Sequence, residues 1–527
     1  MRTIKLVLLL FLTSTLFHVR AQSAGELAEI YADLSFFENP LAHALKKGTK
    51  KRDIERIQNS QLKETAQQLL EGRYDAKYRY ATYDACLTPA TLGHHLLIGD
   101  GYSKYENMTG IYLPMGKHVV LVDGITQDQT VNLLIPNWNR RAPDGIEPTR
   151  DPAGWGIVRQ EIRLHNGVNI IDVKDFDGLA YIDYFSDTPE NENPIQVHFP
   201  AAQVNGYFDV EVNDDTDWNK LIDHAVYPII DARGQHIQVA YPAADCKTHA
   251  YGRGVELISN YDSLVYRQHR LMGLVKYDKV PKNRILARVN YNYYMFRDGD
   301  GVAYMGTDPG NAMPLVVDPD RVISGDPCWG FSHEVGHVHQ LRPAFNWGGL
   351  GEVSNNVFSL YVTTSFGNKS RISEQGNYQK ARESIIEGKI SYLQDEDVFN
   401  RLVPFWQLQL YFSGAGENPD FYPDLFEAFR IQGAEDQRPR RRGGWGDRGD
   451  NPAPHQLNFV KTACKVGNVD LTDFFDQYGF FYVGDFDYED YGNYHYRMTQ
   501  EMVDQCKAEI KAMGLPKPKV LISALSD

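Results

Sequence analysis

Two histidines and a glutamate in the second half of the chain have the types and spacing of a catalytic metal site. His333 and His337 are four residues apart, so on a helix their side chains lie side by side and both imidazoles can bind one metal ion. Glu334 is rotated by about 100° from His333 on such a helix, so its carboxylate can reach a metal-bound water rather than the metal. This pattern indicates zinc-dependent hydrolysis with Glu334 as the general base.

A catalytic zinc ion needs a third protein ligand, which Glu352 can supply. Glu352 lies fifteen residues after His337, beyond a turn rich in Trp and Gly at 346–351, and it begins an apolar helical run. Two helices joined by such a turn can run antiparallel and place Glu352 opposite the histidine pair. Asn356 is one helical turn further on, so it shares this face and can orient a metal ligand through a hydrogen bond. The sequence therefore predicts one zinc ion bound by His333, His337 and Glu352.

The histidine pair must be held by a helix, and the sequence predicts that this helix begins at Asp326-Pro327. An Asp before a Pro favours a helix start, because the carboxylate can cap free amides and the proline fits the first turn. Phe331, Val335 and Val338 then fall on one stripe that can pack inward. His339 lies off the ligand face, so we expect it at the surface or beside the site rather than on the metal.

The rest of the chain divides into segments of different periodicity. Apolar residues recur at helical spacing from Gly25 to about Gly72, whereas short β-prone runs between about Tyr105 and Val212 are typical of an antiparallel β-sandwich. In the mixed stretch that follows, Asp298–Gly301 predicts a β-hairpin. Helices dominate from Asp326 onward. The sequence therefore predicts a multi-domain α+β protein.

The N-terminal residues predict export. Residues 1–21 combine a cationic start, an apolar run and small residues at the positions that signal peptidase reads, so we expect cleavage after Ala21. The first cysteine is Cys86, far from this cleavage position, so a lipid-anchored lipoprotein is not expected. No later apolar stretch reaches the roughly 20 residues of a membrane span. We expect a secreted or periplasmic protein.

Charge and cysteine content exclude several classes of partner and fold. The chain has 54 Lys and Arg against 69 Asp and Glu, a net charge of −15, which is the wrong sign for binding nucleic acid or an anionic membrane. Its five cysteines are an odd number without a CxxC pair, so neither a disulfide scaffold nor a thiolate zinc site is indicated, and one bridge remains open. We expect a monomer.

These motifs resemble a known family. The run from His333 to Gln340, followed by Trp347 and by Gly351 to Asn356, is similar to the enhancin-like peptidases of family M60, whose members include mucin-directed glycopeptidases. Residues 109–116 resemble the beginning of the family's β-sandwich, and residues 470–480 resemble its helical closing segment. The similarity covers about Tyr105 to Gly484.

The resemblance implies a β-sandwich packed on a mixed, mainly helical catalytic portion of the gluzincin type. It also implies one zinc ion held by His333, His337 and Glu352, with Glu334 as the base and with mucin-type O-glycosylated glycoproteins as substrates. Trp347, between the two metal-bearing helices, could stack on a sugar ring of such a substrate, and packing inside the protein is an equal alternative.

We divide the chain into five segments on these grounds. They are a signal peptide at 1–21, a helical N-terminal region at 22–104, a β-sandwich portion at 105–215, the zinc-peptidase catalytic portion at 216–485 and a C-terminal helical tail at 486–527.

Two questions remain open at the level of sequence. The hydrogen-bond donor for the oxyanion has no motif of its own, and the candidates are His495 and the tyrosines around it, namely Tyr491, Tyr494 and Tyr496. The alternative function is a surface protein that binds glycans or mucin and keeps zinc without catalysis. Glu334 argues against this alternative, because binding alone does not require a carboxylate directly after the first ligand.

Overall fold

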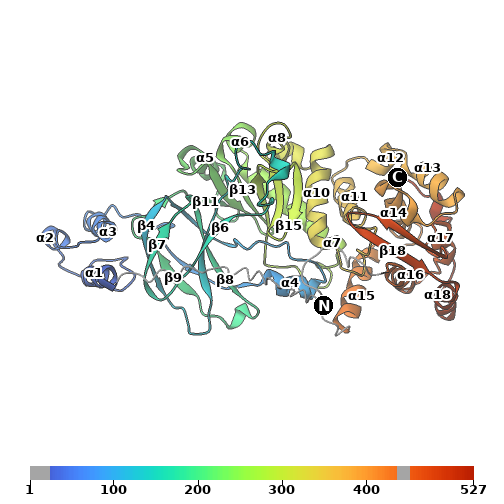
Figure 1. Cartoon of the computed structure of the whole chain (residues 1–527), viewed down its shortest axis with the longest axis horizontal. Helices are drawn as coiled ribbons and strands as arrows, with labels where there is room; N and C mark the ends of the chain where they lie inside the picture. Colours follow the sequence, from blue (N-terminus) through green and yellow to red (C-terminus); the bar gives the residue numbers. More distant parts are fainter. Residues whose placement is uncertain (1–23, 436–450) are drawn as a thin grey trace, which may run out of the picture.

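The computed structural model describes residues 24–435 and 451–527. The predicted signal peptide lies outside the described residues. The molecule is elongated, with the N-terminal helices at one end, a β-sandwich next to them, a mixed sheet in the middle and a mainly helical part at the other end (Figure 1). The predicted α+β class is confirmed. Among the described residues no helix is both long and apolar enough to span a bilayer, and all five cysteines are free.

Three helices form the N-terminal end, as the periodicity predicts. They are α1 (Ala24–Leu34), α2 (Lys51–Ile54) and α3 (Ser60–Leu70). Their apolar side chains pack against Val119, Leu121 and Val168 on the outer face of the sandwich. The Asp33 carboxylate accepts hydrogen bonds from the backbone amides of Gln58 and Asn59 at 2.7–3.1 Å, which ties α1 to the turn before α3. The helices are therefore packed on the sandwich as one unit.

Two sheets enclose the core of the predicted sandwich. The first has the order β1 (Tyr80–Tyr83), β9 (Ile195–His198), β4 (Gly116–Asp123) and β7 (Gly167–Val173). The second has the order β10 (Gln203–Val204), β3 (Asn107–Leu113), β8 (Gly178–Ser186), β5 (Val131–Pro136) and β6 (Arg159–Arg163), and β2 (Cys86–Leu87) pairs with β8. Strands β1 and β2 precede position 105, so the segment expected to be wholly helical also contributes strands. Both strands are short, and the strands with which they pair lie about 100 residues away in the sequence. Local periodicity therefore does not predict them.

A mixed six-stranded sheet follows the sandwich and carries the helix of the histidine pair. Its order is β11 (Tyr207–Asp209), β12 (Ile229–Arg233), β13 (Ile237–Pro242), β14 (Ile285–Asn290), β16 (Gly301–Met305) and β15 (Met295–Asp298). Strands β15 and β16 form the predicted hairpin, with Asp298 opposite Gly301. Strand β15 is the edge of this sheet and lies next to α10 (Gly325–His339).

Helices cover this sheet and make up the C-terminal part. Those before α10 are α4 (Pro89–Leu96), α5 (Asp215–His224), α6 (Ala243–His249), α7 (Gly254–Leu271), α8 (Met313–Val316) and α9 (Pro319–Val322). Those after it are α11 (Ser354–Ser365), α12 (Arg371–Glu374), α13 (Asn377–Ala381), α14 (Val398–Ser413), α15 (Phe421–Glu435), α16 (Ala453–Gly467), α17 (Thr472–Gln477) and α18 (Gln500–Ala512).

The C-terminal tail, expected to be helical, begins instead with a hairpin. Its strands are β17 (Gly484–Glu489) and β18 (Asn493–Met498), and only the following α18 is helical. Along β18 buried Tyr494, Tyr496 and Met498 alternate with exposed residues, which is the period of a half-buried strand. This hairpin packs on the loop between α10 and α11, so it belongs to the site described below (Figure 1).

Helix α10 begins at Gly325, one residue before the predicted start, and buries the predicted stripe of apolar residues. Asp326 does not cap it but pairs with Arg371. Of the two positions expected for His339, at the surface or beside the site, the surface position is wrong. The His339 side chain is fully buried and donates a hydrogen bond from Nδ1 to Gln268 Oε1 at 2.7 Å, because α7 covers that side of the helix.

Helices α10 and α11 come into close contact at a glycine. A Cβ atom at Gly336 would lie 2.7 Å from the backbone carbonyl oxygen of Asn355, which is closer than nonbonded atoms can approach. At Gly330, on the same helix, the nearest neighbour of a Cβ would be the Met295 Sδ at 3.1 Å, and this side chain can move. Gly336 is therefore required by the packing of the two helices, whereas Gly330 is not.

We expect Gly336→Ala to lower the free energy of unfolding by about 1–3 kcal/mol, because the added methyl group pushes α11 away from α10. Gly330→Ala is the matched control and should be neutral or stabilising by up to about 1 kcal/mol, since alanine favours a helix. Thermal and urea unfolding of both variants measure the difference. Equal stability of the two variants would contradict this account of the contact.

Candidate metal centre

Three side chains, two from helix α10 and one from the loop between α10 and α11, converge on one point. The Glu352 Oε2 atom lies 3.1 Å from His333 Nε2 and 3.4 Å from His337 Nε2. The two imidazole rings are 4.8 Å apart between centroids and nearly perpendicular. One ligand atom from each of the three side chains lies within 4.8 Å of the others, which makes them a possible metal site. The structure thus brings together the two histidines and the glutamate that the sequence singles out.

Hydrogen bonds determine which ring nitrogen of each histidine faces this point. His333 Nδ1 donates to Asn356 Oδ1 at 2.8 Å, and His337 Nδ1 donates to Gln340 Oε1 at 3.1 Å. Each Nε2 therefore presents a lone pair toward the carboxylate of Glu352. The amide nitrogen Nδ2 of Asn355 also lies 3.0 Å from His337 Nε2 and 3.3 Å from His333 Nε2. Two imidazole nitrogens and one carboxylate oxygen are a donor set that suits zinc, with room left for a further ligand.

The electrostatics of the three groups also favour a bound cation. Burial disfavours the charged form of His333, but the carboxylates of Glu352 and Glu334 outweigh burial and raise its pKa to about 9. Burial likewise disfavours the charged form of Glu352, but its contacts with the two histidines hold its pKa well below the usual range. The centre therefore binds positive charge strongly, in the form of a proton or a metal ion.

Glu334 lies beside this point without joining the three ligands. Its side chain is buried, and burial raises its pKa, with the neighbouring histidines opposing the shift and Glu352 adding to it. A carboxylate in such surroundings is a stronger base than one in water. This is the property that a general base needs.

The loop before Glu352 is held from three sides. The Gln340 Nε2 atom donates to the backbone oxygen of Gly351 at 2.8 Å, and Arg401 Nη1 donates to that of Gly349 at 2.8 Å. From the β17–β18 hairpin, the Tyr488 hydroxyl donates to the backbone oxygen of Gly348 at 2.8 Å. The loop is therefore fixed by residues far apart in the chain, which keeps Glu352 opposite the histidines.

Trp347 lies inside the protein, so the structure favours the packing alternative for this residue. Its side chain is 2% exposed, and Nε1 donates to the Tyr392 hydroxyl at 2.9 Å. The rings of Phe405 and Phe459 lie 6.4 and 5.5 Å from the indole between centroids. The indole is enclosed by the aromatic core and has no free face for a sugar, because helices α14 and α16 cover it.

The four candidates for the oxyanion donor have different surroundings. His495 points outward, with more than half of its side chain exposed, and contacts Asp485 and Asp487. Tyr496 is buried and donates to the Tyr482 backbone oxygen, and the ring of Tyr494 is also buried. The pKa shift of Tyr491 includes the charges of Glu352 and Glu334, which relates this residue to the metal centre.

Tyr491 lies at the tip of the β17–β18 hairpin, and its side chain is 65% exposed. Its pKa is raised, first by the charge of Glu352, then by burial and by other groups that include Asp490, Tyr293 and Glu334. These carboxylates act on Tyr491 only because its hydroxyl lies within electrostatic reach of the centre. A raised pKa keeps this hydroxyl protonated, so it can donate a hydrogen bond.

Two further aromatic residues near the centre were not singled out by the sequence. Tyr293, in the loop between β14 and β15, is 41% exposed and stacks on Trp155 with 4.4 Å between ring centroids and an angle of 11°. The run Tyr291-Asn292-Tyr293-Tyr294 was a possible signal, because adjacent tyrosines in a loop are common in binding surfaces. The sequence does not show that this run lies near the metal centre, because that proximity depends on the tertiary fold.

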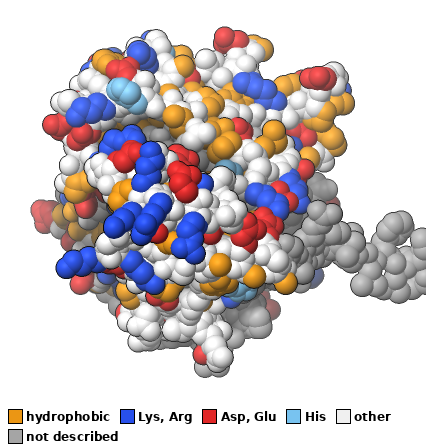
Figure 2. Space-filling view, turned by 90° about the vertical axis from the view of Figure 1, so that its left-hand side faces the viewer, with side chains coloured by type: hydrophobic (Ala, Val, Ile, Leu, Met, Phe, Trp, Pro, Cys, Tyr) orange, Lys and Arg blue, Asp and Glu red, His pale blue; other side chains and the backbone are white. Residues whose placement is uncertain are grey.

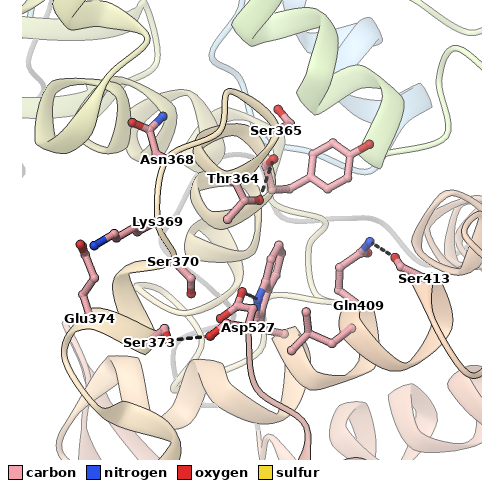
Figure 3. A pocket seen from close by; sticks show the side chains of 13 residues that line it. Thr364, Ser365, Asn368, Lys369, Ser370, Ser373, Glu374, Gln409, Ser413 and Asp527 are labelled. Atoms are coloured by element: carbon pink, nitrogen blue, oxygen red, sulfur yellow. Dashed lines mark hydrogen bonds between the residues drawn. The ribbon is translucent and has the colours of Figure 1, made fainter.

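A cavity of about 790 Å³ lies at the other end of α11, away from the metal centre (Figure 3). Polar side chains from α11, α14 and the segment between α11 and α12 line much of it, among them Thr364, Asn368, Ser370, Gln409 and Ser413. Glu352 immediately precedes the opposite, N-terminal end of α11. The cavity is therefore separate from the centre.

Three solved structures are similar to this chain over most of its length. A metallopeptidase from Bacteroides thetaiotaomicron has a TM-score of 0.78 at 24% identity, and the match covers 97% of this chain and 83% of that one. A metallopeptidase in complex with Tn antigen has a TM-score of 0.72 at 25% identity, with 86% and 81% covered. The M60 catalytic domain of ZmpC from Clostridium perfringens, in complex with the sialyl T antigen, has a TM-score of 0.60 at 16% identity, with 85% and 82% covered.

No curated protein matches the chain. Residues 204–479 match the family model described as Peptidase M60, enhancin and enhancin-like. This match spans more than half of the chain and contains the histidine pair, Glu334 and Glu352. The chain therefore belongs to the M60 family of enhancin and enhancin-like peptidases.

Proposed function

We propose that this protein is a zinc-dependent endopeptidase that hydrolyses peptide bonds of glycoproteins with mucin-type O-glycans. The observation that carries the proposal is the convergence of His333, His337 and Glu352 on one point, with the buried carboxylate of Glu334 beside it. Membership of the M60 family supports the same reaction class. The three converging side chains are the zinc ligands, and Asn356 orients His333.

The reaction divides between the metal and the chain's own side chains. His333, His337 and Glu352 would hold a zinc ion, which would supply Lewis-acid polarisation of the scissile carbonyl and of a water molecule. Glu334 accepts the proton of the attacking water and passes it to the leaving amine, since its raised pKa makes it both a competent base and a competent acid. Tyr491 donates a hydrogen bond from its hydroxyl to the oxyanion of the tetrahedral intermediate.

The substrate lies between the edge strand and the hairpin tip. Strand β15 is the free edge of its sheet next to α10, so it can pair with an extended peptide backbone. The exposed ring of Tyr293, supported by stacking on Trp155, and that of Tyr491 offer faces for a sugar next to the scissile bond. Two similar structures are complexes with the Tn antigen and with the sialyl T antigen, which supports O-glycans as the sugar recognised.

The protein acts outside the cytoplasm, either in the periplasm or beyond the cell. The support is the sequence of residues 1–21, with cleavage after Ala21. We take the working unit to be a monomer, as expected from the sequence.

We expect the purified protein to contain one equivalent of zinc and His337→Ala to lose it, because three protein ligands are the minimum for a tight catalytic site. His495→Ala is the matched control, since this exposed histidine lies away from the centre and should leave the metal in place. Elemental analysis of the three proteins measures the metal content. A full equivalent of zinc in His337→Ala would exclude the proposed ligand set.

We expect Glu334→Gln to keep the metal and the fold but to lower kcat by a factor of about 10²–10⁴, because the amide cannot accept the proton of the water. Mass-spectrometric mapping of cleavage products, from a mucin and from the same mucin after removal of O-glycans, measures both activity and specificity. The wild type should cleave only the glycosylated form.

Two results of that experiment would contradict the proposal. Equal cleavage of both forms by the wild type would indicate a general peptidase. An inactive wild type that still binds the mucin would indicate the non-catalytic glycan-binding alternative.

We expect Tyr491→Phe to lower kcat by about 10²–10³ with little change in KM, because the lost hydrogen bond forms only in the transition state. His495→Gln, on the same hairpin but pointing outward, is the control and should keep the wild-type kcat. Steady-state kinetics on one O-glycopeptide compare the two. If Tyr491→Phe raised KM alone, the tyrosine would bind substrate without acting on the oxyanion.

A further inference from the structure

Positive charge is concentrated at the end of the molecule opposite the helical part. The segment from Lys46 to Arg56 contains α2 and the residues on both sides of it, and we call it the basic tip. It protrudes from the N-terminal end, far from α10 and α11 (Figure 1). Its two acids, Asp53 and Glu55, are outnumbered by six exposed cations, namely Lys46, Lys47, Lys50, Lys51, Arg52 and Arg56.

This charge is opposite in sign to that of the chain as a whole. The chain has a net charge of −15, yet the view onto this end shows many Lys and Arg side chains in its left half, with fewer Asp and Glu side chains among them (Figure 2). Arg52 lies 3.9 Å from the Asp53 carboxylate, and the other five cations form no salt bridge with any residue that the structure describes. Their mutual repulsion is therefore mostly uncompensated by the protein itself.

The backbone of the basic tip is held in place. Ile54 and Ile57 are almost fully buried in the cluster that joins the N-terminal helices to the sandwich. The hydrogen bonds from Gln58 and Asn59 to Asp33 anchor the chain directly after it. The cations are thus presented on a fixed scaffold, so an anion that binds them does not have to order the backbone first.

The composition of the tip indicates the chemistry of its partner. Its one large apolar side chain, Ile54, is 3% exposed, so the tip has no apolar group to insert into a bilayer. It has no aromatic residue on which a nucleic-acid base could stack. Several cations on a protruding surface suit an extended hydrophilic polymer with repeated negative charges, because each anion along the polymer can meet one of them.

We propose that the basic tip binds anionic glycan chains of the glycoprotein substrate, namely chains that carry sulfate esters or sialate carboxylates. This inference rests on the proposed function, since it takes the partner to be the glycoprotein that the centre cleaves. The tip holds the polymer at a second point, away from the metal centre. Binding at two points raises the effective concentration of the remaining chain near the centre, so cleavage of long anionic substrates is favoured.

The test compares a tip variant with a charge-matched control. The tip variant is Lys50→Glu, Lys51→Glu and Arg52→Glu, and the control is Lys282→Glu, Lys380→Glu and Lys465→Glu, which changes three exposed lysines elsewhere by the same charge. Biolayer interferometry measures binding of each full chain to immobilised sulfated, sialylated mucin at low and at physiological salt. The same mucin after desulfation and sialidase treatment is the neutral probe.

We expect the wild type and the control to bind the anionic mucin at least about tenfold more tightly than the tip variant, with a difference that shrinks as salt screens the charges. The three proteins should bind the neutral mucin alike and cleave a short neutral O-glycopeptide at the same rate. If the Glu variant unfolds, the same three positions changed to Gln remove the positive charge without reversing it, and the same loss is expected.

Three results would overturn the inference. Equal binding of the tip variant and the wild type to anionic mucin would exclude the tip as the binding site. An equal loss of affinity in the control variant would show that only the net charge of the protein matters. Tighter binding of the wild type to phosphatidylglycerol vesicles or to duplex DNA than to the mucin would assign the tip to a different partner. A protein that binds anionic mucin through the tip but cleaves no glycopeptide would refute the proposed function and leave the tip's binding intact.

Discussion

The contact between α10 and α11 at Gly336 is the constraint on which the metal centre depends. Because this residue has no side chain, the backbone of α11 approaches α10 closely enough for Asn355 to touch it. Glu352 immediately precedes α11, so the same approach brings its carboxylate within 3.4 Å of both histidine Nε2 atoms. Two packed helices and the loop between them therefore create a site that neither helix contains alone.

Polar groups around this contact decide how the site can be used. Asn356 and Gln340 accept the Nδ1 protons of the two histidines, so both Nε2 lone pairs face Glu352. The loop before Glu352 is held by Arg401 from α14 and by Tyr488 from the C-terminal hairpin. The hairpin also brings Tyr491 within electrostatic reach of Glu352 and Glu334. The β17–β18 hairpin, near the end of the chain, thus both supports the loop before Glu352 and supplies Tyr491 as a candidate hydrogen-bond donor to the oxyanion.

The elongated shape separates the charges of the molecule. The metal centre lies on α10, which contacts the edge strand β15, whereas the basic tip lies beyond the sandwich at the other end of the molecule (Figure 1). A short peptide cannot reach both places, but a long glycosylated polymer can. The proposed binding at the basic tip is compatible with a net charge of −15, because the positive charge there is local and far from the acidic groups of the centre.

The sequence by itself determined the features that depend on local spacing. These are the helix of His333 and His337, the candidate third ligand Glu352, the hairpin at Asp298–Gly301 and the short β-prone runs of the sandwich. The positions of Trp347 and Tyr491 were decided only by the tertiary structure. An exposed or a buried aromatic residue looks the same in a sequence, and Trp347 is buried because α14 and α16, distant in the chain, pack over it. Tyr491 lies near the centre because the β17–β18 hairpin folds back onto a loop some 140 residues earlier, a contact that local periodicity does not encode.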